Sequence, residues 1–548
     1  MKNIGRRLAL GFAFAAVAVG AIVTGGAAAP HDLELAGVAT PNTRSDGFAP
    51  ASKLSPELQE VVWAQGSTSL ENPEALTSYY GYDNNVVNAA GAPVMVPTTA
   101  NPIEAHKTEP DKNTYLVFKN GLGGPDPTYD YGNAFLFQGH EGGPAGPSGN
   151  LGYITRINLD ADAAHRVTLY PLTDNNGQPI ITIDGSTWDP FAERLLFTTE
   201  NQNAPTYAVT ATWPSSVEDI SGSIGRGGYE GIQNDSDGNL WIDEDIGSPT
   251  NKPAPAVSAR FPNSFLFRFV PDSTGDLHNG KLQALQVLNE ANQPITFESQ
   301  SPHQSPDQVA LHTYGKIFST NWVTVHDTAV DGNDPFNANL AAKAAHATPF
   351  KRPENGLFQP SSHFRTYFFD ETGDTNAAST ENSCCGGFGS VFKLTQSDPS
   401  ADHGNLTIFY KADQAHSSFD NVAFLSKNQV TFVQDAGEGV HGVAGFDSGF
   451  VFDVNTDYSN AANQPIRWLA QGRDASATLD AGITATARGG NDQDNEITGT
   501  TVSNGDPGIG GILGQKNPNL FHAGWRWFYT QQHGDNVTYE VIPAPRGD

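Results

Sequence analysis

The sequence predicts an all-β protein, a β-propeller of six or seven blades with long inserts and a few short helices. Its 548 residues include 57 Gly and 36 Pro, and 10% of them are aromatic, a composition typical of turn-rich β proteins. From residue 114 onward, short apolar strands end on polar or acidic residues, and an insert then leads to a second strand. Recurring strand pairs of this kind favour propeller blades, and a sandwich built from the same hairpins is the alternative.

The N-terminal 29 residues have the pattern of a signal peptide. Lys2, Arg6 and Arg7 precede an apolar run over 8–23, and small residues at 25–29 suit cleavage near Ala29. The paired arginines are compatible with twin-arginine export as well as with the ordinary route. No later stretch is long and apolar enough to span a membrane. We therefore expect a secreted or periplasmic protein without a membrane span.

The mature chain divides into a lead-in and a propeller domain. Residues 30–110 are rich in Pro, Ala, Asn and Thr and predict an extended lead-in, with one helical pattern over 55–65. Residues 111–548 form the predicted propeller, in which an insert contains a second helical pattern at 337–347. Strands are also expected at 194–197 and 315–319. The predicted hairpins pair 133–137 with 152–157, 238–242 with 264–269, 365–369 with 389–394, 428–433 with 449–453, and 525–529 with 537–540.

Acidic residues outnumber basic ones by 60 to 30, and the net charge is −30. This balance argues against a nucleic-acid partner, whose phosphates need Lys and Arg, and it suits a protein that binds cations. Plain solubility is the alternative explanation. Several carboxylates follow predicted strands and would meet at one mouth of a propeller, where clustered oxygens suit Ca²⁺. These residues are Glu141, Glu200, Glu244, Glu354 and Asp435. Each alone could equally be an exposed turn carboxylate.

Arg352 and Glu354 flank Pro353, which imposes an extended conformation on the residue before it. Positions two apart in an extended segment point to the same side. The pair therefore offers a cation for an anionic group and a carboxylate for a metal or a proton. A surface ion pair beside a turn is the alternative.

Two further features leave their roles open. His140 precedes Glu141 and is either a hydrogen-bonded structural histidine, a transition-metal ligand or a proton donor. The adjacent Cys384 and Cys385 could be free thiols, a vicinal disulfide or metal ligands. We interpret them as part of a loop without a catalytic role.

The chain lacks a Gly-x-Ser-x-Gly elbow, a His-Glu-x-x-His motif and a P-loop, which disfavours serine hydrolases, zincins and ATPases. Four short segments instead resemble the PhoX-type alkaline phosphatase family, and they occur in the family's order between about residues 130 and 440. The segments are 138–141, 195–201, 352–354 with the following 389–392, and 420–424 with 433–437.

The resemblance implies a divergent secreted propeller phosphatase with calcium and iron at the funnel mouth. It implies metal ligation by Glu141, Glu200, Glu354 and Asp435, catalysis involving Glu354, and phosphate binding by Arg352. The family's bridging cysteine is missing from the comparable run at 183–188, where Asp184 could substitute as an oxygen ligand. We therefore expect Ca²⁺, and the missing cysteine argues against a thiolate-bridged Fe³⁺ pair.

These observations predict a metal-dependent phosphatase that acts as a monomer on small-molecule phosphoric esters. A calcium-dependent lactonase-type propeller and a non-enzymatic, calcium-stabilised binding propeller are the alternatives. Metal analysis followed by an activity assay separates the three.

Overall fold

The computed structural model describes most of the predicted propeller domain. The described residues are 32–42, 51–75, 77–83, 106–143, 145–146, 149–247, 259–297, 305–375, 381, 384–436, 440, 446–472, 496–532 and 536–545. The predicted signal peptide, residues 1–29, lies outside them. No helix among the described residues is long and apolar enough to cross a membrane.

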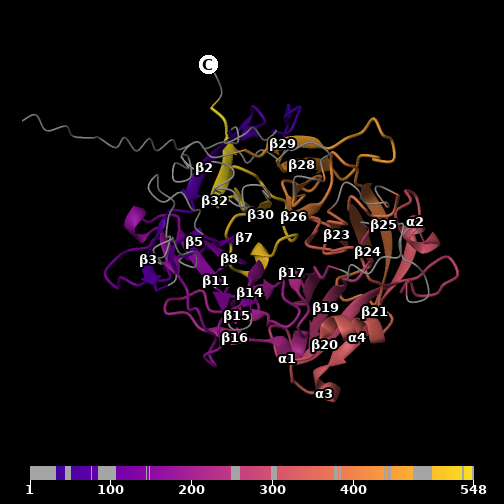
Figure 1. Cartoon of the computed structure of the whole chain (residues 1–548), viewed down its shortest axis with the longest axis horizontal. Helices are drawn as coiled ribbons and strands as arrows, with labels where there is room; N and C mark the ends of the chain where they lie inside the picture. Colours follow the sequence, from indigo (N-terminus) through magenta and orange to yellow (C-terminus); the bar gives the residue numbers. More distant parts are fainter. Residues whose placement is uncertain are drawn as a thin grey trace, which may run out of the picture.

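The described chain is an all-β propeller with a few short helices, as the sequence predicts (Figure 1). Blade 1 contains β7 (Pro110–Val117), β8 (Ala134–His140), β11 (Tyr153–Asn158) and β12 (Val167–Leu169). Blade 2 contains β13 (Ile183–Asp189), β14 (Arg194–Thr199), β15 (Tyr207–Val209) and β16 (Val217–Asp219). Blade 3 contains β17 (Tyr229–Asn234), β18 (Leu240–Glu244), β19 (Leu266–Pro271), β20 (Gly280–Val287) and β21 (Phe318–Asp327).

The remaining blades complete the circle. Blade 4 contains β22 (Gly356–Phe358), β23 (Thr366–Glu371), β24 (Ser390–Gln396) and β25 (His403–Lys411). Blade 5 contains β26 (Phe419–Phe424), β27 (Gln429–Gln434), β28 (Ser448–Asp453), β29 (Ile466–Ala470) and β1 (Lys53–Leu54). Blade 6 contains β30 (Ile497–Ser503), β31 (Arg526–Gln531), β32 (Val537–Pro543) and β2 (Leu58–Ala64). Pairing of β21 with β25 joins blades 3 and 4 into one nine-stranded sheet.

The innermost strands β7, β13, β17, β22, β26 and β30 contact one another in sequence and close a ring around the centre. Figure 1 shows several of them near the middle, with the later strands of each blade outside. From this ring we infer six blades within the described residues. Each inner strand begins at the same end of the ring, so residues at these starts can meet although they are far apart in sequence.

The predicted hairpins are confirmed. β8 pairs with β11, β18 with β19, β23 with β24, β27 with β28 and β31 with β32, all antiparallel. The strand predicted at 194–197 is part of β14. The strand predicted at 315–319 begins only at Phe318 and continues to Asp327, because pairing with β20 extends over 320–327.

The helix predicted over 55–65 is wrong, because most of this segment is strand β2 (Figure 1). The strand pairs antiparallel with the edge of β32, and β1 pairs in the same way with β29. An open sheet edge offers unpaired backbone groups, and the adjacent Val61 and Val62 suit a strand. Tertiary pairing therefore overrides the local helical pattern.

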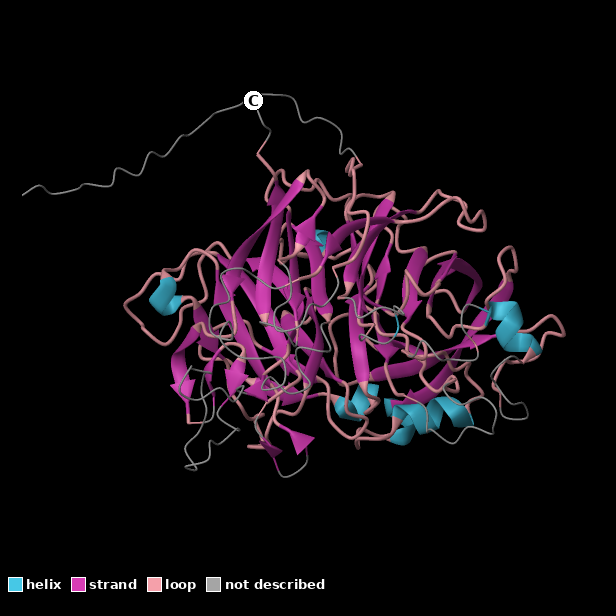
Figure 2. Ribbon diagram, turned by 45° about the horizontal axis from the view of Figure 1, so that its top comes forward, coloured by secondary structure: helices cyan, strands magenta, loops and turns pink. Residues whose placement is uncertain are grey.

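Most of the short helices lie at the periphery (Figure 2). α4 (Ala338–Ala344) confirms the helix predicted at 337–347, and the Asn337 side chain caps it by accepting a hydrogen bond from Leu340 N at 2.8 Å. The others are α1 (Ser221–Ile224), α2 (Pro306–Leu311), α3 (Thr328–Asp331), η1 (Ala163–His165) and η3 (Ile509–Gly511). Two small sheets lie outside the blades: β3 (Ser69–Glu74), β4 (Thr77–Tyr79), β5 (Tyr82–Asp83) and β6 (His106–Lys107), and β9 (Ala145–Gly146) with β10 (Gly149–Asn150).

Aromatic side chains fill the space between blades. Trp241 on blade 3 contacts Phe358 and Tyr367 on blade 4, with ring centroids 4.9 Å apart in both pairs.

At the far ends of the inner strands, the segment after β30 contacts three blades. Val117 N donates to Gly505 O at 2.7 Å, Trp188 Nε1 to Pro507 O at 2.7 Å, and Ser361 N to Gly514 O at 3.2 Å. This segment covers the end of the ring opposite the strand starts.

Candidate metal centre at the propeller mouth

Irregular pairing at the starts of the inner strands turns carboxylates toward the centre. The register between the first and second strands shifts in five blades, at 110–113, 183–186, 229–232, 419–422 and 498–501. Bulges of this kind redirect side chains and are frequent beside active sites. Four of these irregular stretches contain an acidic residue: Asp111, Asp184, Glu230 and Asp420.

Glycines after two of these residues allow adjacent inner strands to approach closely. A Cβ at Gly185 would lie 1.7 Å from Glu230 O, and one at Gly231 would lie 2.7 Å from Glu354 O. Gly231 N also donates a hydrogen bond to Glu354 O at 2.7 Å. Any larger residue at either glycine would push the strands apart. The Asp-Gly and Glu-Gly pairs thus draw acidic residues of neighbouring blades together.

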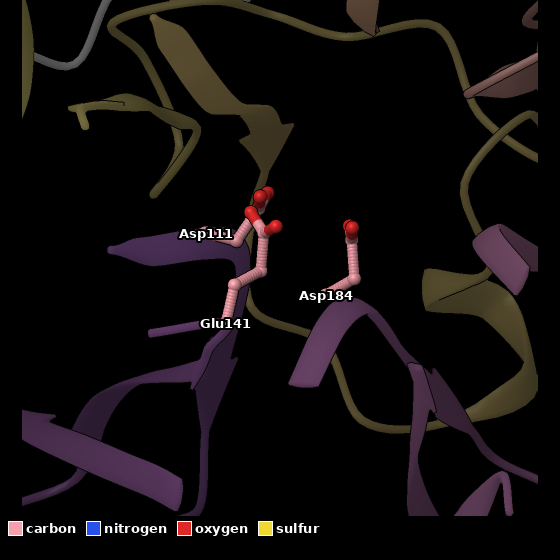
Figure 3. A group of neighbouring side chains, drawn as sticks. All are labelled: Asp111, Glu141 and Asp184. Carbon is pink, nitrogen blue, oxygen red and sulfur yellow. The ribbon is translucent and has the colours of Figure 1, made fainter. Parts of the chain in front are cut away.

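The ends of the second strands supply further carboxylates to this end of the ring, which we call the mouth. Together with the inner-strand residues they form three groups, in each of which one ligand atom per residue lies within 4.8 Å of the others. The groups are Asp111–Glu141–Asp184, Asp184–Glu200–Glu230 and Glu230–Asp245–Glu354. Figure 3 shows the first group, with its three side chains pointing toward the same space. Because Asp184 and Glu230 each belong to two groups, seven carboxylates form one continuous cluster.

Burial and mutual repulsion disfavour the ionised forms of these carboxylates. Burial, followed by the charges of Asp111 and Glu200, raises the pKa of Asp184 well above its usual value. Burial and then Asp184 and Glu354 have the same effect on the pKa of Glu230. Asp245 is an exception: burial raises its pKa, but the Arg352 charge together with hydrogen bonds from Arg352, Glu200 and Glu354 lowers it below its usual value. The seven carboxylates outnumber the positive charges beside them, and bound cations would offset the difference.

Some oxygens of the cluster also lack hydrogen-bond donors. Among the described residues, Asp184 Oδ1 and Glu354 Oε2 are buried and have no hydrogen-bond partner. An unpaired buried polar atom is costly, and a carboxylate oxygen in this state fits a metal ligand. The seven members offer oxygen atoms only, which suit a hard cation such as Ca²⁺. The residues therefore fit calcium.

Arg352 lies at this mouth and is held by three carboxylates. Its Nε lies 2.9 Å from both Asp245 oxygens, and its Nη2 lies 2.7 Å from Asp245 Oδ2. The same Nη2 is 2.8 Å from Glu354 Oε1, close enough for an ion pair although outside hydrogen-bond geometry, and 3.8 Å from Asp435 Oδ2. Arg352 and Glu354 thus meet, as the sequence predicts, but the predicted extended conformation at Arg352 is wrong, because its φ is +58°. The arginine joins blades 3, 4 and 5.

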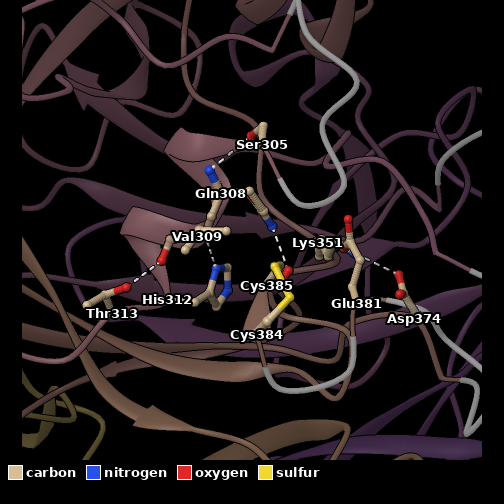
Figure 4. The surroundings of a disulfide bond; sticks show 10 residues. All are labelled: Ser305, Gln308, Val309, His312, Thr313, Lys351, Asp374, Glu381, Cys384 and Cys385. Atoms are coloured by element: carbon tan, nitrogen blue, oxygen red, sulfur yellow. Dashed lines mark hydrogen bonds and ion pairs between the residues drawn. A yellow bond between two sulfur atoms is a disulfide. The ribbon is translucent and has the colours of Figure 1, made fainter. Parts of the chain in front are cut away.

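A buried network fixes the chain immediately before Arg352 (Figure 4). Lys351 Nζ lies 3.0 Å from Asp374 Oδ1 and also contacts Glu381, and Lys351 N donates to Glu371 Oε1 at 2.9 Å. Arg352 itself has a φ of +58°, a left-handed conformation that costs energy in a non-glycine residue. The network supplies the contacts that hold it there.

Cys384 and Cys385 form a vicinal disulfide in the turn that follows this network. Cys384 N donates to Glu381 O at 3.0 Å, and Cys385 O accepts from Gln308 Nε2 at 2.9 Å. Of the three possibilities left open by the sequence, the structure has the disulfide. Its sulfurs are therefore not thiolate ligands.

Beneath the cluster, Lys112 is a buried cation on β7. Its Nζ donates to Asn355 Oδ1 at 3.0 Å, and Asn355 Nδ2 donates to Glu230 Oε1 at 2.8 Å. The lysine therefore fixes which way the Asn355 amide faces and presents its NH₂ group to Glu230. The Lys112 ammonium and the Asn355 amide therefore have hydrogen-bond partners below the cluster.

Two residues considered in the sequence have structural roles. Glu244 lies outside the three groups, because its Oε2 accepts from Phe265 N at 3.0 Å and Asn339 Nδ2 at 2.8 Å. Strand alternation turns its neighbour Asp245 to the mouth instead. His140 is buried between Thr108 and Thr155, 3.1 and 2.8 Å from its ring nitrogens, and burial lowers its pKa to about 3.

The structure brings the other predicted site residues to the mouth. Glu141, Asp184, Glu200 and Glu354 belong to the cluster, and Asp435 lies beside Arg352. Reasoning from strand ends missed further acidic residues, namely Asp111, Glu230, Asp245 and Asp420. The Glu-Gly pair at 230–231, which repeats Asp-Gly at 184–185, is the signal that would have found one of them.

An open pocket of about 420 Å³ lies beside Arg352's partner Asp245. Its walls are mainly amides, hydroxyls and carboxylates, which suit a polar ligand. The lining residues are Thr182, Glu200, Asn201, Gln202, Asn203, Asp245, Ile246 and Gly247.

Comparison with known proteins supports the fold. No family model and no curated protein sequence matches this chain. Among solved structures, the chain is similar to PhoX of Pseudomonas fluorescens in complex with vanadate, a transition-state analogue, with a TM-score of 0.51 and 8% identity over 92% of this chain and 98% of PhoX. A gluconolactonase of Xanthomonas campestris matches with a TM-score of 0.35 and 10% identity over 92% of this chain and all of the other. At such identities the likeness to PhoX supports the propeller fold and does not establish family membership.

Proposed function

We propose that this protein is a metal-dependent phosphoric ester hydrolase with a calcium site at the propeller mouth. The observation that carries the proposal is the continuous cluster of seven carboxylates, in which Asp184 and Glu230 are each shared by two groups. Buried like charges at these separations are relieved by protons or by cations bound between them, and an oxygen-only cluster suits calcium. The propeller fold that the chain shares with PhoX, a protein solved with a transition-state analogue, adds support.

In this proposal, different residues would bind calcium, position the site and act at the reacting centre. Glu141, Asp184, Glu200, Glu230 and Glu354 would hold calcium, which when bound would polarise the phosphoryl oxygens and offset their charge. Asp435 would complete the ligand set on the side of Arg352. Arg352 would keep Asp245 and Glu354 in position and contribute positive charge as the phosphoryl group is transferred. Glu354, with one unpaired oxygen, would act at the reacting centre.

The oxygen-only cluster favours calcium over a thiolate-bridged Fe³⁺ pair. Asp184 occupies the segment where the resembling family has its bridging cysteine, and the only two cysteines are joined to each other. Iron bound through oxygens is a separate outcome that metal analysis would reveal.

We also propose that residues 1–29 direct export and that the mature protein acts outside the cytoplasm as a monomer. Its substrate would be a small phosphoric ester. Mass determination of the N-terminus of protein recovered from the producing cells tests the cleavage near Ala29.

Two measurements test the function. Elemental analysis of the purified protein should find calcium, and hydrolysis of a chromogenic phosphomonoester should stop when a chelator removes it. Calcium without phosphatase activity would favour a lactonase or a binding propeller, which lactone hydrolysis then separates.

Glu354→Gln should lower phosphatase activity on the order of 100-fold while the fold is retained. The matched control is Glu193→Gln, an exposed glutamate in the turn at the far end of the β13–β14 hairpin. Equal activity of Glu354→Gln and the wild type would remove Glu354 from the active site.

A further inference from the structure

Arg260 is a second arginine at the mouth, near Arg352. It precedes β19, and its backbone N donates to Asp374 Oδ1 at 2.7 Å. The same Asp374 oxygen lies 3.0 Å from Lys351 Nζ. One buried carboxylate thus holds both the backbone of Arg260 and the residue before Arg352.

The guanidinium of Arg260 reaches the pocket wall. A Cβ placed on Gly247 would lie 2.9 Å from Arg260 Nη1, so the guanidinium rests against this glycine. Gly247 lines the 420 Å³ pocket together with Glu200 and Asp245. Because position 247 has no side chain, the Arg260 guanidinium has room to lie beside the carboxylate cluster.

The two arginines differ in their partners. Arg352 is held by Asp245, Glu354 and Asp435. Within the described parts of the chain, no carboxylate lies within ion-pair distance of the Arg260 guanidinium, although acidic residues outnumber basic ones by 60 to 30. Burial, and then the nearby Arg352 charge, lowers the pKa of Arg260.

Two guanidinium groups held near each other repel unless an anion joins them. A guanidinium presents several N–H donors in one plane, an arrangement that matches two phosphoryl oxygens at once. Calcium at the carboxylate cluster and a guanidinium at the pocket wall would approach a phosphoryl group from two sides.

We propose that Arg260 binds the phosphoryl oxygens of the substrate and of the inorganic phosphate product. This inference rests on the proposed function and adds to it a residue for substrate binding. Arg352, whose Nε and Nη2 are occupied by carboxylates, serves mainly to position the site.

Binding of inorganic phosphate to the calcium-loaded protein, measured by isothermal titration calorimetry, tests this role. Arg260→Met keeps much of the aliphatic stem and should weaken phosphate binding at least tenfold. Arg260→Lys keeps the charge and should lose less. The control Arg365→Met removes an exposed arginine just before β23, at the end of that strand away from the mouth, and should bind phosphate like the wild type. Calcium affinity should change less than twofold in all three variants.

Phosphate affinity in Arg260→Met equal to that of the wild type, or no phosphate binding by the wild type itself, would overturn the inference. A parallel phosphomonoesterase assay separates the two proposals. A wild type that binds phosphate through Arg260 but hydrolyses no ester would contradict the proposed function alone. A wild type that hydrolyses esters while Arg260→Met binds phosphate normally would contradict this inference alone.

Discussion

The β17–β18 hairpin has acidic residues at both ends, and their surroundings differ sharply. In the turn, Asp235 accepts hydrogen bonds from Asp237 N, Asn239 N, Asn239 Nδ2 and Trp241 Nε1, at 2.8 to 3.0 Å. At the mouth, Glu230 and Asp245 face each other and Glu354 within 4.8 Å. Figure 1 shows β17 at the centre of the molecule, where its neighbours are the inner strands of other blades.

The difference teaches what distinguishes a structural carboxylate from a candidate ligand. Both kinds are buried, so burial alone does not separate them. Asp235 is surrounded by donors that satisfy it, whereas the mouth gathers acceptors from several blades and supplies few donors. Donors stabilise the fold directly, while a surplus of acceptors is relieved only by protons or by a cation from outside the chain.

Of the changes considered, removal of calcium should alter the stability of the protein most, because it acts on the carboxylates of the mouth. A chelator should lower the free energy of unfolding by several kcal/mol, because one site at a hundredfold excess of calcium over its Kd contributes about 2.7 kcal/mol. Denaturant unfolding with calcium and with chelator measures the change. Coincident unfolding curves would show that the mouth is stable without cations.

Asp235→Ala should destabilise the protein by about 1–3 kcal/mol, because it leaves the buried donors of Asn239 and Trp241 unpaired. Calcium affinity should remain that of the wild type, since the turn is remote from the mouth. Thermal unfolding and calcium titration of the same sample test both statements. Weaker calcium binding by Asp235→Ala would contradict this expectation, because it would show that the turn contributes to calcium binding as the mouth does.

Glu230→Gln should have the opposite effect in the metal-free protein. Burial and neighbouring carboxylates raise the pKa of Glu230, so at a pH high enough to ionise it, replacing the carboxylate with an uncharged amide should stabilise that form by about 1 kcal/mol, on the order of one surface ion pair. The same variant should bind calcium more weakly than the wild type. Denaturant unfolding in chelator compares the two metal-free proteins, and lower stability of the variant would argue that the Asn355 hydrogen bond to Glu230 outweighs the repulsion.

The pH dependence should be the subtlest difference. Burial raises the pKa of Asp243 and of Asp420 to about 8, from ordinary values near 4. The folded state then holds protons that the unfolded state has already released, so metal-free stability should be full below about pH 4 and fall as pH rises toward 8. Calcium should flatten this decline. If the stability of the metal-free protein instead rises between about pH 4 and pH 8, the raised pKa values of Asp243 and Asp420 are contradicted.

Much of the fold follows from the sequence because hairpins are local. Alternating apolar residues and turn signals predict strands such as β23 and β24, and their pairing needs no information from elsewhere. The strand in the segment at 55–65 could not be predicted from local sequence, since its partner β32 lies at the other end of the chain. Only the closed ring decides that it is a strand.

The site was predicted where it depends on strand ends and missed where it depends on inner-strand bulges. Glu200 and Glu354 end or precede strands, and their convergence follows from radial repetition alone. Glu230 lies within an irregular stretch whose side-chain direction depends on Gly231 meeting blade 4. The choice of Asp245 over Glu244 likewise depends on which one faces the centre, and strand alternation fixes this only once the register is known.

Calcium titration of the metal-free protein, with the wild type beside Asp184→Asn, tests the shared cluster most directly. Asp184 belongs to two of the three groups, so the account predicts that the wild type binds calcium and that the variant binds fewer ions or binds them at least tenfold more weakly. Equal stoichiometry and affinity in the two proteins, or no calcium binding by either, would contradict it.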